Sequence, residues 1–232
     1  MDKLFAVIPA AGIGTRMQSE VPKQYLPLQS RKVLDCTLKH FCRHREIDAV
    51  VVPLAEHDHW WSTLELADHE KIISTNGGEE RCHSVLNGLR SLANMASSDD
   101  WVLVHDAARP CLRQADLDKL ISTVRTAKHG GILALPVRDT MKRGDDSGYV
   151  LETVERTNLW HALTPQMFRL GELQDSIEHA LQKKLLITDE ASAMELSGHN
   201  VLLVEGHADN IKITHPQDLS LADLYLSNQE KS

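Results

Sequence analysis

The segment between positions 9 and 23 combines glycines with two fixed cations. Gly12 and Gly14 follow an apolar run and let the backbone approach a ligand closely. The backbone N–H groups of such a loop, which includes Ala10 and Ala11, can hold a triphosphate. Arg16 and Lys23 would neutralise the charge that grows on phosphate oxygens as pyrophosphate leaves. The alternative is that both are solvated cations of an ordinary loop.

This segment departs from the two best-known glycine-rich phosphate-binding loops. In the dinucleotide fingerprint G-x-G-x-x-G the third glycine allows a helix to pack closely on a strand, and Met17 stands in its place. No Gly-Lys-Ser or Gly-Lys-Thr follows, as a P-loop would require. The sequence therefore argues against a dinucleotide-dependent oxidoreductase and favours another kind of nucleotide site.

A second glycine pair and a strand-end carboxylate could complete such a site. Gly78 precedes a helical stripe, and Ser84 is placed to cap the helix or to hydrogen-bond a base, although an ordinary capped turn is the alternative. Asp106 follows the apolar run Trp101–Val104, and ligands of open α/β sheets gather at the carboxyl ends of strands. A carboxylate there suits Mg²⁺, because hard cations prefer oxygen ligands; the alternative is a turn-forming aspartate. We expect His105 to support the strand end.

Two further charged residues stand close together near the end of the chain. Asp209 could provide a second Mg²⁺ ligand, and Lys212 could hold a phosphate as a point charge. The segment carries no motif that decides this by itself.

The elements that must position these residues alternate between apolar strands and helices with an apolar stripe. Continuous apolar runs predict buried strands at Leu4–Ile8, Ala49–Val52, Trp101–Val104 and Gly131–Leu135. Helical spacing predicts helices over 34–42, 85–93, 117–124 and 170–183, another opening at 189–190, and a terminal helix from Pro216. Two more strands are predicted at Val201–Glu205 and Asn210–Thr214. This order indicates an α/β fold, with a Rossmann-like, mostly parallel sheet covered by helices on both faces.

The region 137–159 breaks this alternation. Two polar, extended arms, Arg138–Arg143 and Tyr149–Arg156, flank the turn Gly144–Gly148. We expect a β-hairpin arm that projects from the body. Because an isolated hairpin is marginally stable in water, it must lie on something, either its own domain or a partner subunit.

Length and net charge indicate the number of domains and exclude several kinds of binding partner. The 232 residues, 42% of them hydrophobic, predict one domain spanning 1–232. The net charge of −8 argues against a general affinity for nucleic acid or acidic membranes, and no stretch is apolar enough to span a bilayer. The N-terminus lacks the pattern of a secretory signal. We therefore expect a cytoplasmic protein whose four cysteines are reduced thiols.

Taken together, the segments resemble the 2-C-methyl-D-erythritol 4-phosphate cytidylyltransferases of the non-mevalonate isoprenoid pathway. The likeness covers nearly the whole chain and rests on these stretches, in order: PAAGIGTRM, PKQ, GGEERCHSV, VLVHDAARP, RDTMKR, LWHALTPQ, TDEAS and DNIKIT. The resemblance implies a nucleotidyltransferase-type fold and an enzyme that joins CTP to a sugar-alcohol phosphate and releases pyrophosphate. It also implies Mg²⁺ or another divalent cation as cofactor, and a homodimer built through the arm.

The resemblance further implies a role for each candidate residue. The CTP site would be lined by Ala10, Ala11, Gly12, Gly14, Gly78 and Ser84. Arg16 and Lys23 would act at the α-phosphate, with Mg²⁺ near Asp106 and Asp209. Arg156 and Lys212 would position the acceptor phosphate, and the acceptor site would also include Arg109, Thr140, Thr188 and Asp209. Thr140 and Arg156 belong to the arm and would serve the partner's active site.

Two alternatives remain open at this point. A ribitol 5-phosphate cytidylyltransferase would share the fold and motifs, although HDAARP and the RDTMK context favour the methylerythritol substrate. An inactive nucleotide-sensing protein could use the same scaffold. Such proteins usually lose a charged active-site residue, whereas this chain retains Arg16, Lys23, Asp106, Asp209 and Lys212.

Overall fold

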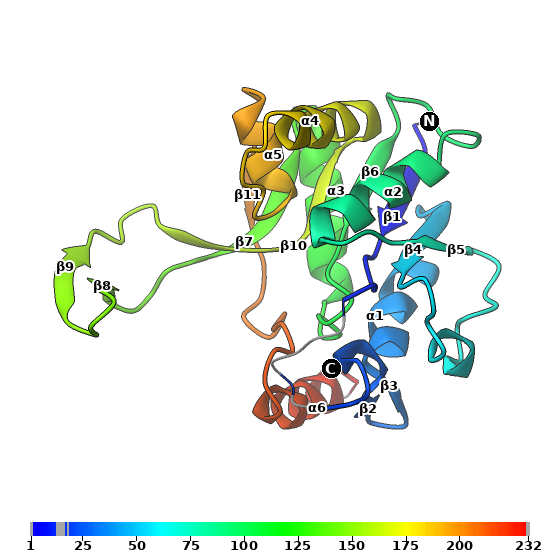
Figure 1. Ribbon diagram of the computed structural model, residues 1–232, viewed down its shortest axis with the longest axis horizontal. Helices are drawn as coiled ribbons and strands as arrows, with labels where there is room; N and C mark the ends of the chain where they lie inside the picture. The colour runs from blue at the N-terminus through cyan, green and yellow to red at the C-terminus, as the bar shows by residue number, and fades with distance from the viewer. Residues whose placement is uncertain (1, 13–16, 18, 231–232) are drawn as a thin grey trace.

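A seven-stranded sheet forms the centre of the structure, a computed structural model that describes residues 2–12, 17 and 19–230 (Figure 1). From edge to edge its strands are β11 (Leu202–Glu205), β7 (Gly131–Pro136), β10 (Trp160–Arg169), β6 (Trp101–Val104), β1 (Leu4–Val7), β4 (Ala49–Leu54) and β5 (Ile72–Asn76). Neighbouring strands are parallel except for β10, which runs antiparallel to both β6 and β7. The predicted mostly parallel α/β sheet is confirmed.

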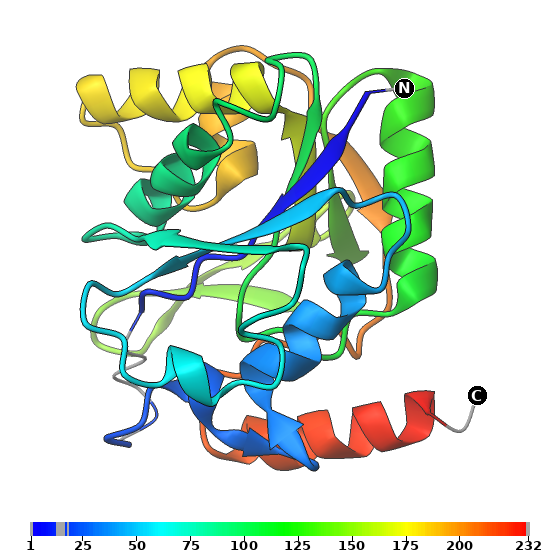
Figure 2. The ribbon, with the colours of Figure 1, turned by 90° about the vertical axis from the view of Figure 1, so that its right-hand side faces the viewer.

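Helices cover both faces of the sheet, as expected for buried parallel strands (Figure 2). One face packs against α1 (Val33–Cys42) and α3 (Gln114–Ala127). The opposite face packs against α2 (Arg81–Ser91), α4 (Leu170–Gln182) and α5 (Glu190–Leu196). Among the described residues, none of the helices has the length and apolar character needed to cross a membrane.

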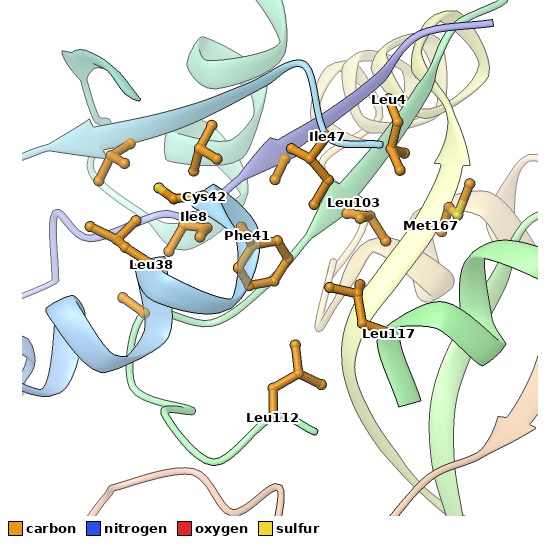
Figure 3. Packing of buried hydrophobic residues seen from close by; sticks show 14 of the residues in the cluster. Leu4, Ile8, Leu38, Phe41, Cys42, Ile47, Leu103, Leu112, Leu117 and Met167 are labelled. Carbon is orange, nitrogen blue, oxygen red and sulfur yellow. The ribbon is translucent and has the colours of Figure 1, made fainter. Parts of the chain in front are cut away.

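Each face of the sheet has its own apolar cluster, because successive strand residues point to opposite sides. In β1, Leu4 and Ala6 join the cluster beneath α1 and α3, whereas Phe5 and Val7 join the cluster beneath α2, α4 and α5. Figure 3 shows part of the first cluster, with the fully buried ring of Phe41 at its centre. Burial on both faces explains why these strands are continuously apolar in sequence.

A smaller layer lies at the end of the sheet where the parallel strands finish (Figures 1 and 2). It contains the short helix η2 (Lys23–Tyr25), the ribbon β2 (Pro27–Leu28) and β3 (Arg31–Lys32), and the terminal helix α6 (Gln217–Gln229). Another short helix, η3 (Trp61–Thr63), lies between β4 and β5. Leu28, Ile213 and Ala222 join this layer to α1 through buried side chains.

The region 137–159 projects from the body as the predicted arm (Figure 1). Its hairpin pairs β8 (Met141–Gly144) with β9 (Val150–Val154), and residues 138–153 are all exposed. In the turn, the carboxylate of Asp145 accepts the N–H groups of Ser147 and Tyr149. Gly148 adopts a φ of +85°, a conformation that glycine reaches without steric cost. The turn signal in the sequence therefore has a definite chemical basis.

Several strand assignments differ from the sequence prediction, which gives no ranges for β2, β3 and β5. Asn210–Thr214 is predicted to be a strand but is irregular, and the Ile213 N–H donates to the carbonyl of Ala108 in a loop instead of to a neighbouring strand. Strand β10 is not apparent in the sequence, because Thr164 and Gln166 interrupt its apolar pattern. Both side chains are nevertheless buried, since hydrogen bonds satisfy their polar atoms.

The other predicted elements are present within a few residues of their expected bounds. Helix α5 opens at Glu190 with a capping box, in which Asp189 and Ser192 each accept a backbone N–H of the other. The four cysteines are free and buried, as expected for reduced thiols.

Candidate active site

A cavity of about 370 Å³, here called the sheet-end pocket, opens where β1 and β6 finish and α2 begins. Its walls include eight residues that the sequence predicts for the site: Ala10, Ala11, Gly12, Lys23, Gly78, Ser84, Asp106 and Lys212. These residues come from segments that lie far apart in the chain. The carboxyl ends of parallel strands bring them together, as the rule for open α/β sheets predicts.

Two glycine-containing loops meet on one wall of the sheet-end pocket. A β-carbon on Gly77 would lie 2.5 Å from Cβ of Ala11 and 3.0 Å from the carbonyl oxygen of Leu54, so this close packing requires glycine. The N–H of Gly78 donates to Oγ of the buried Ser84 at 3.0 Å. The Ser84 hydroxyl therefore shapes the loop that leads into α2.

Gln24 holds the loop after β1, although the sequence alone assigns it no role. Its buried side-chain amide donates to the carbonyl of Ala10 at 2.6 Å and to that of Gly12 at 3.0 Å. One amide thus fixes the course of the loop as far as Gly12. The PKQ stretch contains Gln24, so the family resemblance already included this residue, although no argument from its chemistry gave it a role.

Lys23 connects the same loop region to the segment near the end of the chain. Its Nζ donates to the carbonyl of Ile213 at 2.8 Å, next to the pocket residue Lys212. The structure therefore brings two of the predicted cations to one pocket. Gly14 and Arg16, also predicted for the site, lie outside the described residues.

Asp106 lies in a cluster of cations at the end of β6. Its Oδ1 accepts a hydrogen bond from Nε of Arg81 at 2.9 Å. Its Oδ2 lies 2.9 Å from Nζ of Lys212 and 3.3 Å from Nε of Arg109. Arg81 also forms a bidentate pair with the buried Glu190, at 2.6 and 3.0 Å. Sequence reasoning missed Arg81 and Glu190 because 109 positions separate them, although GGEERCHSV and TDEAS contain them.

These neighbours set the charge of Asp106. Burial alone would raise its pKa, but the three surrounding cations outweigh burial and hold the pKa of Asp106 well below its ordinary value. Burial likewise opposes the charged form of Arg81, and the carboxylates of Glu190 and Asp106 raise its pKa above the ordinary value. Asp106 is therefore an ionised carboxylate, a hard oxygen ligand, at physiological pH.

His105 supports the end of β6, as predicted, in a single tautomer. Its Nε2 lies 3.0 Å from the carbonyl of Arg109, which can only accept, so Nε2 carries the proton. Nδ1 then accepts from the Thr164 hydroxyl at 3.0 Å, and Oγ1 of Thr164 accepts the N–H of Asp106 at 3.1 Å. Burial lowers the pKa of His105 to about 3 and keeps the ring neutral. These bonds tie β6 to β10 directly behind Asp106.

Asp209 does not line the sheet-end pocket. Its Oδ2 accepts from Nε of Arg113 at 2.8 Å and from the Gln229 amide at 3.0 Å, while its buried Oδ1 has no hydrogen-bond partner among the described residues. It lines a separate cavity of about 1290 Å³ beside α1, α3 and α6. Asp209 and Asp106 thus line different cavities, and the predicted role of Asp209 as a second metal ligand stays a prediction. Its contact with the acceptor stays a prediction.

The remaining acceptor residues predicted from the resemblance lie in three places. Arg109 belongs to the cation cluster and also donates to the carbonyl of Asn210 at 2.7 Å. Thr188 is exposed immediately before the N-cap of α5. Thr140 and Arg156 lie on the two sides of the arm, exposed, and neither lines the sheet-end pocket of its own chain. The roles of these residues in acceptor binding stay predictions.

Phosphoryl and nucleotidyl transfer need little covalent chemistry from a protein, because positioning and positive charge provide most of the catalysis. The sheet-end pocket provides both, because Lys23, Lys212 and the Asp106 carboxylate lie beside its glycine-containing loops. The fold and the site together are those of a nucleotidyltransferase. The family model of 2-C-methyl-D-erythritol 4-phosphate cytidylyltransferase matches residues 4–228. The chain belongs to this family.

Individual relatives agree with the family match over the full length of the chain. The 2-C-methyl-D-erythritol 4-phosphate cytidylyltransferases of Tolumonas auensis and Vibrio cholerae are each 51% identical, over 99% and 100% of both chains respectively. A crystal structure of the Francisella tularensis 2-C-methyl-D-erythritol 4-phosphate cytidylyltransferase is similar with a TM-score of 0.84 at 37% identity, over 96% of this chain and 99% of that one. A 4-diphosphocytidyl-2C-methyl-D-erythritol synthase structure gives 0.85 at 38% identity, over 97% and 100%.

Proposed function

We propose that this chain is a cytidylyltransferase that joins CTP and 2-C-methyl-D-erythritol 4-phosphate to give 4-diphosphocytidyl-2-C-methyl-D-erythritol and pyrophosphate. The observation that carries the chemistry is the meeting of Lys23, Lys212 and Asp106 at the glycine-lined sheet-end pocket. Membership of the family over residues 4–228 supports the two substrates. The names of the relatives favour the methylerythritol acceptor over ribitol 5-phosphate.

The reaction is an in-line displacement at phosphorus. An oxygen of the acceptor's phosphate attacks the α-phosphorus of CTP, a new P–O bond forms, and the bond to the bridging oxygen breaks so that pyrophosphate leaves. No general base is required, since a phosphate monoester is largely ionised at neutral pH. Lys23 and Lys212 neutralise charge on the reacting phosphates, and the loop fixed by Gln24 positions the nucleotide.

The pocket fits a divalent cation at Asp106. The carboxylate is ionised, and its Oδ2 is shared between a longer contact to Arg109 and the partly exposed Lys212, which can exchange partners. Asp106 would hold Mg²⁺ together with the substrate phosphates, the ligand set that this ion prefers. When bound, the ion supplies further neutralisation of phosphate charge. This set does not need Asp209.

We infer from the exposed arm that the chain assembles into a homodimer. Tyr149, Val150 and Leu151 present apolar side chains that are 63–74% exposed, a surface that calls for cover by another molecule. We propose that the arm packs on a second copy of the chain. Thr140 and Arg156 would then reach the acceptor site of that copy, which accounts for their exposure and for their absence from the lining of their own sheet-end pocket.

Pyrophosphate release tests this function directly. The protein is mixed with CTP and Mg²⁺, and with either 2-C-methyl-D-erythritol 4-phosphate or ribitol 5-phosphate. We expect rapid release with the methylerythritol acceptor alone. Release only with ribitol 5-phosphate would retain the chemistry and refute the acceptor, whereas silence with both would refute the proposed activity.

A further inference from the structure

The pair between Arg81 and Glu190 joins three elements behind the sheet-end pocket. Arg81 is the first residue of α2, Glu190 is the first residue of α5, and Asp106 follows β6. Both terminal nitrogens of the guanidinium bind Glu190, and its Nε binds Asp106. The three guanidinium nitrogens of Arg81 therefore all donate to carboxylates, Nε to Asp106 and the two terminal nitrogens to Glu190.

The two oxygens of Asp106 consequently have different neighbours. Oδ1 is bound at 2.9 Å by a guanidinium whose other side is fixed. Oδ2 contacts Lys212, whose side chain is 38% exposed, and Arg109 at the longer distance of 3.3 Å. Oδ2 is the oxygen whose partners can change when phosphates enter the pocket.

We propose that Glu190 is a positioning residue for the transfer reaction: acting through Arg81, it fixes Oδ1 of Asp106 and leaves Oδ2 as the oxygen that can change partners in the sheet-end pocket. This inference rests on the proposed cytidylyl transfer and extends it to a residue that does not line the pocket. Without Glu190, the guanidinium could rotate toward Asp106 and occupy both oxygens in a fork, a geometry that arginine favours. Asp106 would then be closed to other partners.

The position of Glu190 is itself fixed by the sheet. The Ala191 N–H donates to Oε1 of Gln166 in β10 at 2.8 Å, and Nε2 of Gln166 donates to Asp189 at 2.9 Å. Gln166 is buried, and these bonds hold the start of α5 in place without any ligand. Glu190 is 1% exposed, so its charge is not needed for solubility. Because apolar residues can often replace buried ion pairs without loss of stability, a role in orientation accounts for the charge better than a role in folding.

The test compares Glu190→Gln with the unsubstituted protein. Glutamine keeps the size of the side chain but replaces one acceptor oxygen with a donor that faces the guanidinium. We expect kcat to fall roughly 10- to 100-fold, as is common when a residue that orients a ligand-binding group is lost. The KM for CTP and its dissociation constant from calorimetry should change less than about threefold, because Gln24 and Lys23 remain in place.

Asp100→Asn provides a matched control. Asp100 is a buried carboxylate that directly precedes β6, at the end of this strand opposite to Asp106. It accepts the N–H groups of Lys3 and Ser97. We expect this variant to lose thermal stability and to keep its kcat. A double variant, Arg81→Met with Glu190→Met, removes the ion pair while retaining apolar bulk. It should fold, so a loss of kcat in this variant arises from the loss of the Arg81 contact that fixes Oδ1 of Asp106 and not from unfolding.

A Glu190→Gln enzyme with kcat within about twofold of the original would overturn the positioning role. The role would also be overturned if kcat fell in both Glu190→Gln and Asp100→Asn in proportion to the loss of folded protein in each variant. Absence of turnover by the unsubstituted protein with CTP and 2-C-methyl-D-erythritol 4-phosphate would instead refute the proposed function, so the two failures are distinguishable.

Discussion

Lys23 and Lys71 make the same kind of contact in two different parts of the molecule. Nζ of Lys23 donates to the carbonyl of Ile213 at the sheet-end pocket. Nζ of Lys71 donates to the carbonyls of His44 and Ile47, at 2.9 and 2.7 Å, away from that pocket. The two lysines therefore allow the electrostatic contribution of Lys23 to be separated from the loss of a hydrogen bond.

We expect Lys23→Ala to lower kcat by roughly 100- to 1,000-fold, the usual loss when one group that stabilises transition-state charge is removed. Lys71→Ala should keep kcat and lose only stability. Steady-state kinetics and thermal denaturation of both variants measure this difference. Turnover by Lys23→Ala at the original rate would remove Lys23 from the chemistry.

The buried, neutral His105 makes folding stability depend on pH. Burial lowers its pKa to about 3 in the folded protein, whereas the ordinary value is 6.5. The unfolded chain therefore binds more protons between these values, so stability is fully present above pH 6.5 and falls as the pH drops toward 3, by up to about 1.4 kcal/mol per unit. Burial lowers the pKa of His40 as well, so His40 adds a term of the same sign.

Urea denaturation between about pH 4.5 and about pH 7, a range that includes the ordinary histidine pKa, measures how the free energy of unfolding depends on pH. His105→Gln should unfold more easily at pH 7 and show a shallower dependence of unfolding free energy on pH. His57→Gln, at an exposed position, should reproduce the original slope. Equal slopes in all three proteins would contradict the neutral state of His105.

At the level of elements, four of the parallel strands could be predicted from sequence because apolar packing covers them on both faces of the sheet. β1, β4, β6 and β7 are apolar throughout, and the pattern identifies them. Strand β10 could not be found this way, because the burial of Thr164 and Gln166 depends on hydrogen-bond partners supplied by the segment after β6 and by α5. The pair of Arg81 and Glu190 could not be predicted from the sequence for the same reason, because only the folded chain brings these residues together.

The contact between the two glycine-containing loops gives a prediction at this scale. A methyl group at position 77 would press on Cβ of Ala11 and on the carbonyl of Leu54. We therefore expect Gly77→Ala to separate the loops, destabilise the protein by about 1–3 kcal/mol and raise the KM for CTP roughly tenfold. Gly144→Ala in the arm is the control, since its β-carbon would meet nothing closer than 3.5 Å. An unchanged KM in Gly77→Ala would show that the loop contact does not shape the nucleotide site.

At the scale of the whole molecule, the proposed packing of the arm on a second copy predicts that one chain cannot build a complete acceptor site alone. Lys23 belongs to the body and Arg156 to the exposed arm. If sites are shared, a dimer of one Lys23→Ala chain and one Arg156→Ala chain contains one site with both changes and one with neither. Random mixing of the two inactive variants in a two-fold symmetric dimer should then restore about a quarter of the original activity.

Co-expression of the two variants, followed by a pyrophosphate assay, measures this recovery. Mixtures of Lys23→Ala with Lys212→Ala serve as the control, because both lysines line the same pocket of one chain and no intact site can form. Recovery in neither mixture would mean that each chain builds its site alone.

The hydrogen bond from Lys23 to Ile213 spans 190 positions of the chain. During synthesis on a ribosome, the residues that hold the nucleotide loop therefore emerge long before the segment that completes the pocket. Contacts of such long sequence separation are also slow to form, because closing a long loop costs entropy before the contact is gained. A nascent chain that has not yet reached Ile213 lacks the carbonyl that Lys23 binds, so the finished site arises only when translation has passed this residue.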